Sequence, residues 1–148
     1  MKSQTLLYAL LVFALIALGA LWVFSTLETQ ESTPVFSATI QRDCAPWDGS
    51  AFAVSIPVAG SVIGISIYQS PDIKLPVKFS FPDDTGQVGN ALLVFPAGTP
   101  EQLTGKVSFQ RVEQATPVEG EFDLLTEMGE RFNGRFMAEW NNQPVYCG

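Results

Sequence analysis

The chain has 148 residues, a net charge of −7, two cysteines and no histidine. This length suits one domain of ordinary size in addition to a targeting segment, and the acidic balance argues against nucleic acid or anionic lipid headgroups as partners. Without histidine, the Ser-His-Asp and Cys-His catalytic arrangements and histidine-dependent zinc sites are excluded.

Residues 6–24 form an apolar run of 19 residues with no charge and no strongly polar side chain. A run of about 20 apolar residues is what a helix needs to cross the ~30 Å hydrocarbon core of a membrane. The sequence therefore predicts a transmembrane signal-anchor helix over 6–27, preceded by a short cytoplasmic N-terminus of residues 1–5. Lys2 before the run, and the two acidic residues Glu28 and Glu31 as the first charges after it, agree with this orientation.

A cleaved signal peptide is the alternative interpretation of the same segment. A small-x-small site lies at its end, and cleavage near Gly19 or Ala20 would release a secreted protein. Cleavage there would leave the apolar residues 21–24 at the new N-terminus, and this favours an uncleaved anchor. The polar residues 28–34 are then a tether, and 35–148 form a domain on the outer side of the membrane.

Beyond the tether, apolar residues alternate with polar ones at a period of two, which predicts strands with one buried face. A continuous apolar stretch over 91–95 is typical of a strand that is covered on both faces. Pro76 interrupts the clearest alternation and indicates an edge strand or a bulge. The alternating stretches are 36–40, 52–56, 63–67, 73–81, 103–109, 118–124 and 132–140.

Turn-forming residues separate these stretches, at 47–50, 57–60, 82–86, 96–100 and 127–130. Seven to nine short strands with regular turns and no helical stretch predict an all-β fold, an antiparallel β-sandwich. A small up-and-down barrel is the alternative.

A weak repeat in the last third of the chain places a glycine at the same point of three strands. Gly105, Gly120 and Gly134 each lie two residues after one apolar residue and two residues before another. The repeat predicts three consecutive strands of a meander, in which glycine relieves crowding on the inward face or permits a bend.

Cys44 and Cys147 flank almost the whole domain. On the outer side of a membrane the compartment is oxidising, and two lone cysteines are predicted to pair there. The first and last strands would then be neighbours. Trp47 and Trp140 are expected to pack near this junction, in the manner of aromatic side chains that cover disulfides.

Paired carboxylates are the one catalytic option that remains. Glu119, Glu121 and Asp123 alternate along one strand and share its outward face beside Lys106 and Arg135. A glycosidase needs two carboxylates that face a cleft, and an exposed charged strand does not supply one. Other carboxylate pairs lie in the turns, at 83–84 and at 127 and 130. We therefore predict no catalytic residue, no metal site and no cofactor.

The expected role is non-enzymatic binding or scaffolding by a single-pass protein of the cell inner membrane. The domain would face the periplasm or the cell exterior, with membrane lipid around the helix and a protein partner in the envelope. The alternatives are a barrel that binds a lipid or another small apolar ligand, and a small carboxylate-dependent hydrolase. The candidate interaction residues are Trp47, Val58, Val62 and Trp140.

Overall fold

The computed structural model describes residues 33–147. The predicted N-terminus and helix, and most of the predicted tether, lie outside the described residues. Within 33–147 there is no helix with the length and apolar character of a membrane span.

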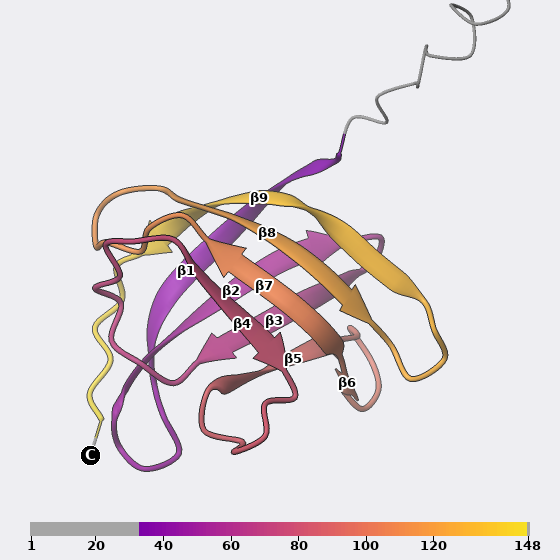
Figure 1. Cartoon of the computed structure of the whole chain (residues 1–148), viewed down its shortest axis with the longest axis horizontal. Helices are drawn as coiled ribbons and strands as arrows, with labels where there is room; N and C mark the ends of the chain where they lie inside the picture. The colour runs from indigo at the N-terminus through magenta and orange to yellow at the C-terminus, as the bar shows by residue number, and fades with distance from the viewer. Residues whose placement is uncertain (1–32, 148) are drawn as a thin grey trace, which may run out of the picture. The chain divides into compact units, whose positions relative to one another are not determined.

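The described part of the chain is all-β, as the period of two predicts, and contains nine strands (Figure 1). The strands are β1 Val35–Cys44, β2 Ser50–Val58, β3 Ser61–Ile67, β4 Val77–Phe81, β5 Gly89–Val94, β6 Glu101–Gln102, β7 Thr104–Phe109, β8 Val118–Leu125 and β9 Arg131–Asn141.

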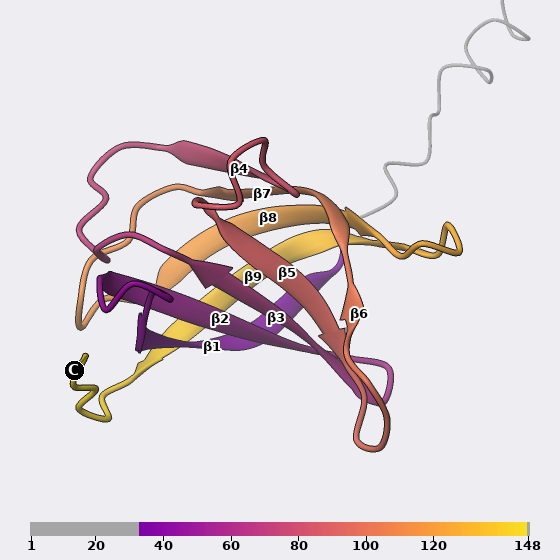
Figure 2. The same ribbon diagram turned by 90° about the horizontal axis from the view of Figure 1, so that it is seen from below.

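All nine strands belong to one curled sheet of half-barrel form, in the order β4-β7-β8-β9-β1-β2-β3-β5-β6. The two separate sheets of the predicted sandwich are therefore not confirmed. Figure 2 shows how the sheet curls: β4, β7 and β8 lie on one side, and β1, β2 and β3 lie on the other. Alternation along a strand reports which face is buried, but not whether the facing strands belong to a second sheet.

The sheet is mixed rather than purely antiparallel, because its first and last long strands run parallel. β1 pairs with β9 from Val35 opposite Arg135 to Gln41 opposite Asn141, and the other named pairings are antiparallel. The prediction that the first and last strands are neighbours is confirmed. The predicted antiparallel arrangement is wrong for this pair, because alternation along a strand carries no information on the direction of its neighbour.

The two ends of the sheet are linked by the stretch that contains β6 and β7. β6 pairs with β5, and after Leu103 the chain continues as β7, which pairs with β4 and β8. The Leu103 N–H also donates to the Ala91 carbonyl at 2.8 Å. The direct connection from β6 to β7 therefore holds the two ends of the curled sheet close together around one core.

The core is built from the inward positions that the alternation predicts. Ile40, Phe52, Ile65 and Val107 are among the side chains with no exposed surface. Aromatic rings meet across the interior: Phe109 lies edge-on to Phe52 at 5.5 Å and to Phe136 at 5.7 Å between ring centroids. The two sides of the curled sheet are thus in direct side-chain contact.

The predicted strand over 73–81 is shorter than expected. β4 begins only at Val77, and Ile73 forms an isolated bridge to Val112. Leu75, which the alternation places inside, is 75% exposed. Pro76 has no N–H to contribute to a ladder, which explains why regular pairing starts after it. β4 is an edge strand, as Pro76 indicates.

The three repeated glycines lie in the predicted meander, since β7, β8 and β9 are consecutive neighbours. A Cβ atom at Gly120 would overlap the Phe136 ring and the Ser108 carbonyl oxygen, and one at Gly134 would overlap the Phe36 ring. Glycine at these inward positions therefore provides the space that two core aromatic rings occupy.

We predict that Gly120→Ala destabilises the protein by about 1–3 kcal/mol, the usual cost of overpacking a core. Gly64→Ala is the matched control, because Gly64 lies on an outward face and its nearest neighbour, Val94 Cγ2, would be 4.0 Å from the new methyl group. The control should stay within about 0.5 kcal/mol of the wild type. Urea unfolding of the purified chain in a non-ionic detergent measures both values, and equal losses would contradict the packing role of Gly120.

Candidate functional site

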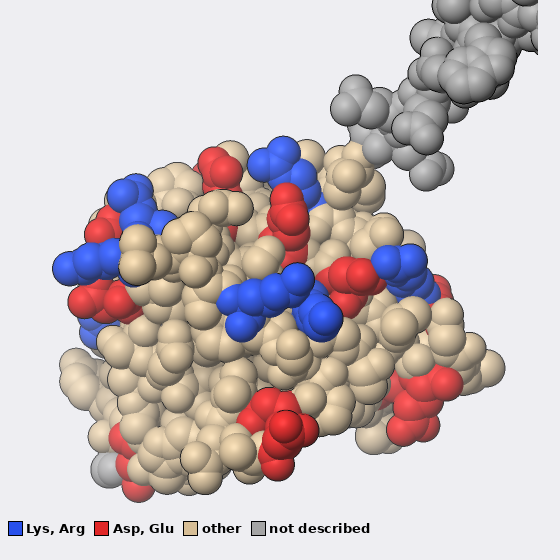
Figure 3. Space-filling view, viewed as in Figure 1, with Lys and Arg blue, Asp and Glu red and all other residues tan. Residues whose placement is uncertain are grey.

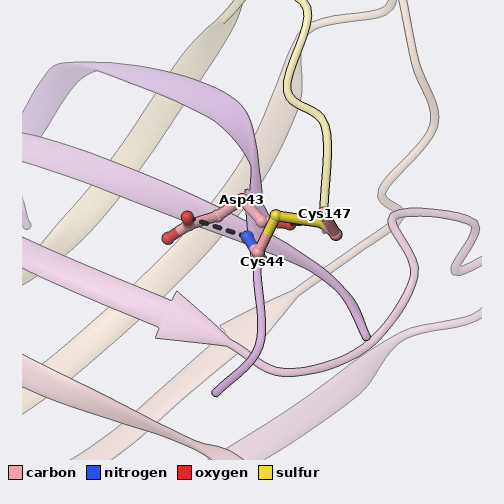
Figure 4. The surroundings of a disulfide bond; sticks show 3 residues. All are labelled: Asp43, Cys44 and Cys147. Carbon is pink, nitrogen blue, oxygen red and sulfur yellow. Dashed lines mark hydrogen bonds between the residues drawn. A yellow bond between two sulfur atoms is a disulfide. The ribbon is translucent and has the colours of Figure 1, made fainter. Parts of the chain in front are cut away.

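The predicted disulfide is present. Cys44 and Cys147 are bonded across a sequence separation of 103 residues, with 5.6 Å between their Cα atoms. Cys44 is the last residue of β1, and its backbone N–H donates to the Asp43 carboxylate at 2.8 Å (Figure 4). The bond ties the C-terminal tail that follows β9 back to the neighbouring strand.

The four candidate interaction residues do not form one surface. The Val58 side chain is 8% exposed and belongs to the core. Trp140 packs against that core, and its indole N–H donates to the Glu113 carbonyl at 2.8 Å. Trp47 is 53% exposed and meets Tyr68 edge-on at 5.5 Å between ring centroids. Val62 is half-buried, opposite Val94 in the ladder.

Val62 lies on an outward surface that Trp47 borders, and we call this surface the uncharged face. It is formed by the outward side chains of β2, β3 and β5. At the Trp47 end, the Tyr68 hydroxyl accepts a hydrogen bond from the Asn90 side-chain amide at 2.9 Å. The members of the face are Ala53, Ser55, Pro57, Val62, Gly64, Ser66, Asn90, Leu92 and Val94.

The uncharged face carries no Asp, Glu, Lys or Arg. The sequence holds the signal for it, because residues 49–71 and 85–100 contain no charged residue. This face was not predicted, because the two charge-free stretches form one surface only through the pairing of β2, β3 and β5. Depletion of charged side chains is one feature that interface cores share.

The other half of the sheet presents a charged face, formed by the outward side chains of β4, β7, β8 and β9. Figure 3 shows positive and negative side chains interspersed on this side of the molecule. Arg131 forms two hydrogen bonds to the Asp123 carboxylate, at 2.7 and 2.8 Å. Arg135 lies 3.6 Å from the Glu121 carboxylate.

A shallow depression of about 280 Å³ lies on the charged face. Its walls come from all four strands and from Thr33, the first described residue. Thr33, Lys78, Lys106, Ser108, Glu121, Phe122, Asp123, Arg131, Asn133 and Gly134 line it.

The Arg131 guanidinium holds the pKa of the Asp123 carboxyl below its usual range, mainly through the two hydrogen bonds. The charges of Lys106 and Lys78 act in the same direction, and desolvation opposes them. Asp123 is therefore an ionised partner in an ion pair, which is the opposite of a general acid that must keep its proton.

Three of the carboxylates considered for catalysis have structural partners. Glu121 faces Arg135 and Asp123 faces Arg131. The Asp83 carboxylate accepts hydrogen bonds from the Thr85 hydroxyl and from the N–H groups of Thr85, Gln87 and Val88, and these bonds lower its pKa. Asp83 thus closes a turn. Among residues 33–147, no group of three acidic or Cys side chains is placed to hold a metal ion.

Comparison with known proteins gives no significant match to a family model, to a curated protein or to a solved structure. The site must therefore be interpreted from its own geometry.

We predict that the native protein shows no reactive thiol before reduction and two after it. Reduction should lower stability by about 2–4 kcal/mol, because closing a loop of this length restricts the unfolded chain. Thiol labelling with mass detection, combined with urea unfolding with and without reductant, measures both effects. Stoichiometric labelling of unreduced protein would contradict the pairing.

A second prediction concerns Asp123. The pKa of Asp123 in the folded state lies below its value of about 3.9 in the unfolded chain. The ion pair with Arg131 therefore stabilises the fold at pH values above about 3.9. The contribution is lost as the pH falls through the folded-state pKa. In a carboxyl-detected NMR titration, Arg131→Gln should move the Asp123 midpoint up toward about 3.9. An unchanged midpoint would show that Arg131 does not act on this carboxylate.

Proposed function

We propose that the chain is a single-pass, membrane-anchored protein whose β-domain faces the periplasm or cell exterior and binds an envelope protein without catalysing a reaction. The uncharged face is the observation that carries the binding role. The outward positions of β2, β3 and β5 hold small polar and apolar side chains with no charge, in a domain that has 20 charged residues. A solvated strand face commonly carries charges, whereas the centre of an interface is depleted of them.

The disulfide supports the extracytoplasmic location. Such bonds persist in oxidising compartments and are rare in the cytosol. Combined with the apolar residues 6–24, the bond between Cys44 and Cys147 favours a domain on the outer side of a membrane.

The two alternative functions have less support. A carrier of an apolar ligand needs interior space, but ring contacts between Phe52, Phe109 and Phe136 occupy the interior. A carboxylate-dependent hydrolase needs two acids with different protonation states in a cleft, and the two acids that line the depression, Glu121 and Asp123, are engaged by arginines.

The anchor is tested by fractionation and intact mass. We expect the protein to stay in the membrane pellet at alkaline pH, to need detergent for release, and to retain residues 1–27 by mass. Deleting residues 6–24 should abolish membrane retention. A soluble protein whose mass begins near Gly19 or Ala20 would show instead that the segment is a cleaved signal.

The binding role is tested by placing a charge on the uncharged face. We expect Ser66→Lys to abolish stoichiometric co-purification of an envelope protein in mild detergent, because a buried unpaired charge is costly at an interface. Ser80→Lys, on the charged face, is the matched control and should retain the partner. The unfolding midpoint of each variant checks that it folds. Retention of the partner by both variants, or no partner with the wild type, would overturn the proposal.

A further inference from the structure

The cations of this acidic domain are concentrated on one face. Residues 33–147 contain seven Lys and Arg, and four of them, Lys78, Lys106, Arg131 and Arg135, lie on the charged face. Arg131 and Arg135 are engaged with Asp123 and Glu121. Within the described residues, Lys78 and Lys106 have no carboxylate within 4.0 Å, so the two lysines are the cations of this surface that form no ion pair.

The two lysines face the same space. In the ladder between β4 and β7, Lys78 lies opposite Ser108 and Lys106 lies opposite Ser80. They are diagonal neighbours, with backbones about 7–8 Å apart, and both line the depression. Side chains of this length and spacing can converge on one anionic group.

The other groups in the depression complete a set of donors. The Ser108 hydroxyl, the Asn133 side-chain amide and the Arg131 guanidinium line it with the two lysines. The two carboxylates present, Asp123 and Glu121, are balanced by arginines. Ammonium, guanidinium, hydroxyl and amide donors around one hollow match the oxygen atoms of a phosphate group.

The depression lies where the chain enters the domain. Thr33 lines it, and the neighbouring Pro34 carbonyl accepts a hydrogen bond from the Arg135 N–H at 2.9 Å. Between residue 24, the end of the apolar run, and Thr33, the chain can span at most about 30 Å. If the segment is an anchor, as the proposed function states, this depression is within reach of the lipid headgroups.

We propose that the depression binds the phosphate of a phospholipid headgroup and holds the charged face of the domain against the membrane surface. This proposal rests on the proposed membrane anchor. The domain carries 13 acidic residues against seven basic ones, so an anionic surface repels it on average. The lining of the depression holds three cations, Lys78, Lys106 and Arg131, against the two carboxylates, so it is a locally positive area of an acidic domain, and its charge acts over a Debye length of about 8–10 Å.

The test uses the full chain in a non-ionic maltoside detergent, titrated with dihexanoyl phosphatidylglycerol and followed by NMR of the Lys, Ser108 and Asn133 signals. We expect saturable shifts at the depression. A Lys78→Gln/Lys106→Gln variant should bind about 25-fold more weakly, from about fivefold per lysine. Lys74→Gln/Arg111→Gln removes the same charge elsewhere and should bind as the wild type does.

Three results would overturn the proposal: no saturable shift with the phospholipid, equal weakening in both double variants, or binding of inorganic phosphate as tight as that of the lipid. The last result would identify a free anion as the ligand. The fractionation and intact-mass experiment tests the anchor separately. A cleaved segment combined with intact headgroup binding would refute the anchor, and a retained segment without headgroup binding would refute only the site.

Discussion

The parallel pairing of β1 with β9 is the contact on which the rest of the fold depends. It joins two antiparallel series of strands, β4-β7-β8-β9 and β1-β2-β3-β5-β6, into one sheet. Seven residue pairs form this ladder, and the disulfide at Cys44 covalently secures its far end. These contacts join residues about 100 positions apart, so their loop-closure entropy is large and the protein should fold slowly. A disulfide that shortens this loop in the unfolded chain is well placed to offset that cost.

Core positions were predictable because successive side chains of a strand point to opposite faces of the sheet. The inward residues of β2, β3 and β8 were identified correctly from alternation, and the meander was indicated by its glycines. The arrangement of strands was not predictable in the same way. Alternation gives the face of each residue but not the neighbouring strand, and the sandwich was inferred from the number of short strands and the regular turns between them. The start of β4 was missed because alternation continues through Pro76, which cannot donate to the ladder.

The candidate surfaces were less predictable than the core. Val58 and Val62 are adjacent to the same turn in the sequence, yet one side chain faces the core and the other faces outward. The depression depends on register: Lys78 and Lys106 are 28 positions apart and meet only because β4 pairs with β7. A single sequence contains both the charges and the charge-free stretches, but only the pairing of strands brings them onto faces.

Curling of the sheet places the charged and uncharged faces on opposite sides of one core, because β4, β7 and β8 lie across from β2 and β3 (Figure 2). The core between them is packed with aromatic rings and cannot compress readily. The distance and orientation between the two faces are therefore fixed. The chain enters at the start of β1, and the disulfide lies at its other end, roughly 30 Å away for a strand of this length. In the proposed arrangement, a domain held at its entry point and by its charged face would present the uncharged face away from the lipid. In this proposal a rigid sheet can contact lipid through its charged face and a protein through its uncharged face at the same time. No conformational change is needed, which suits a small scaffolding subunit.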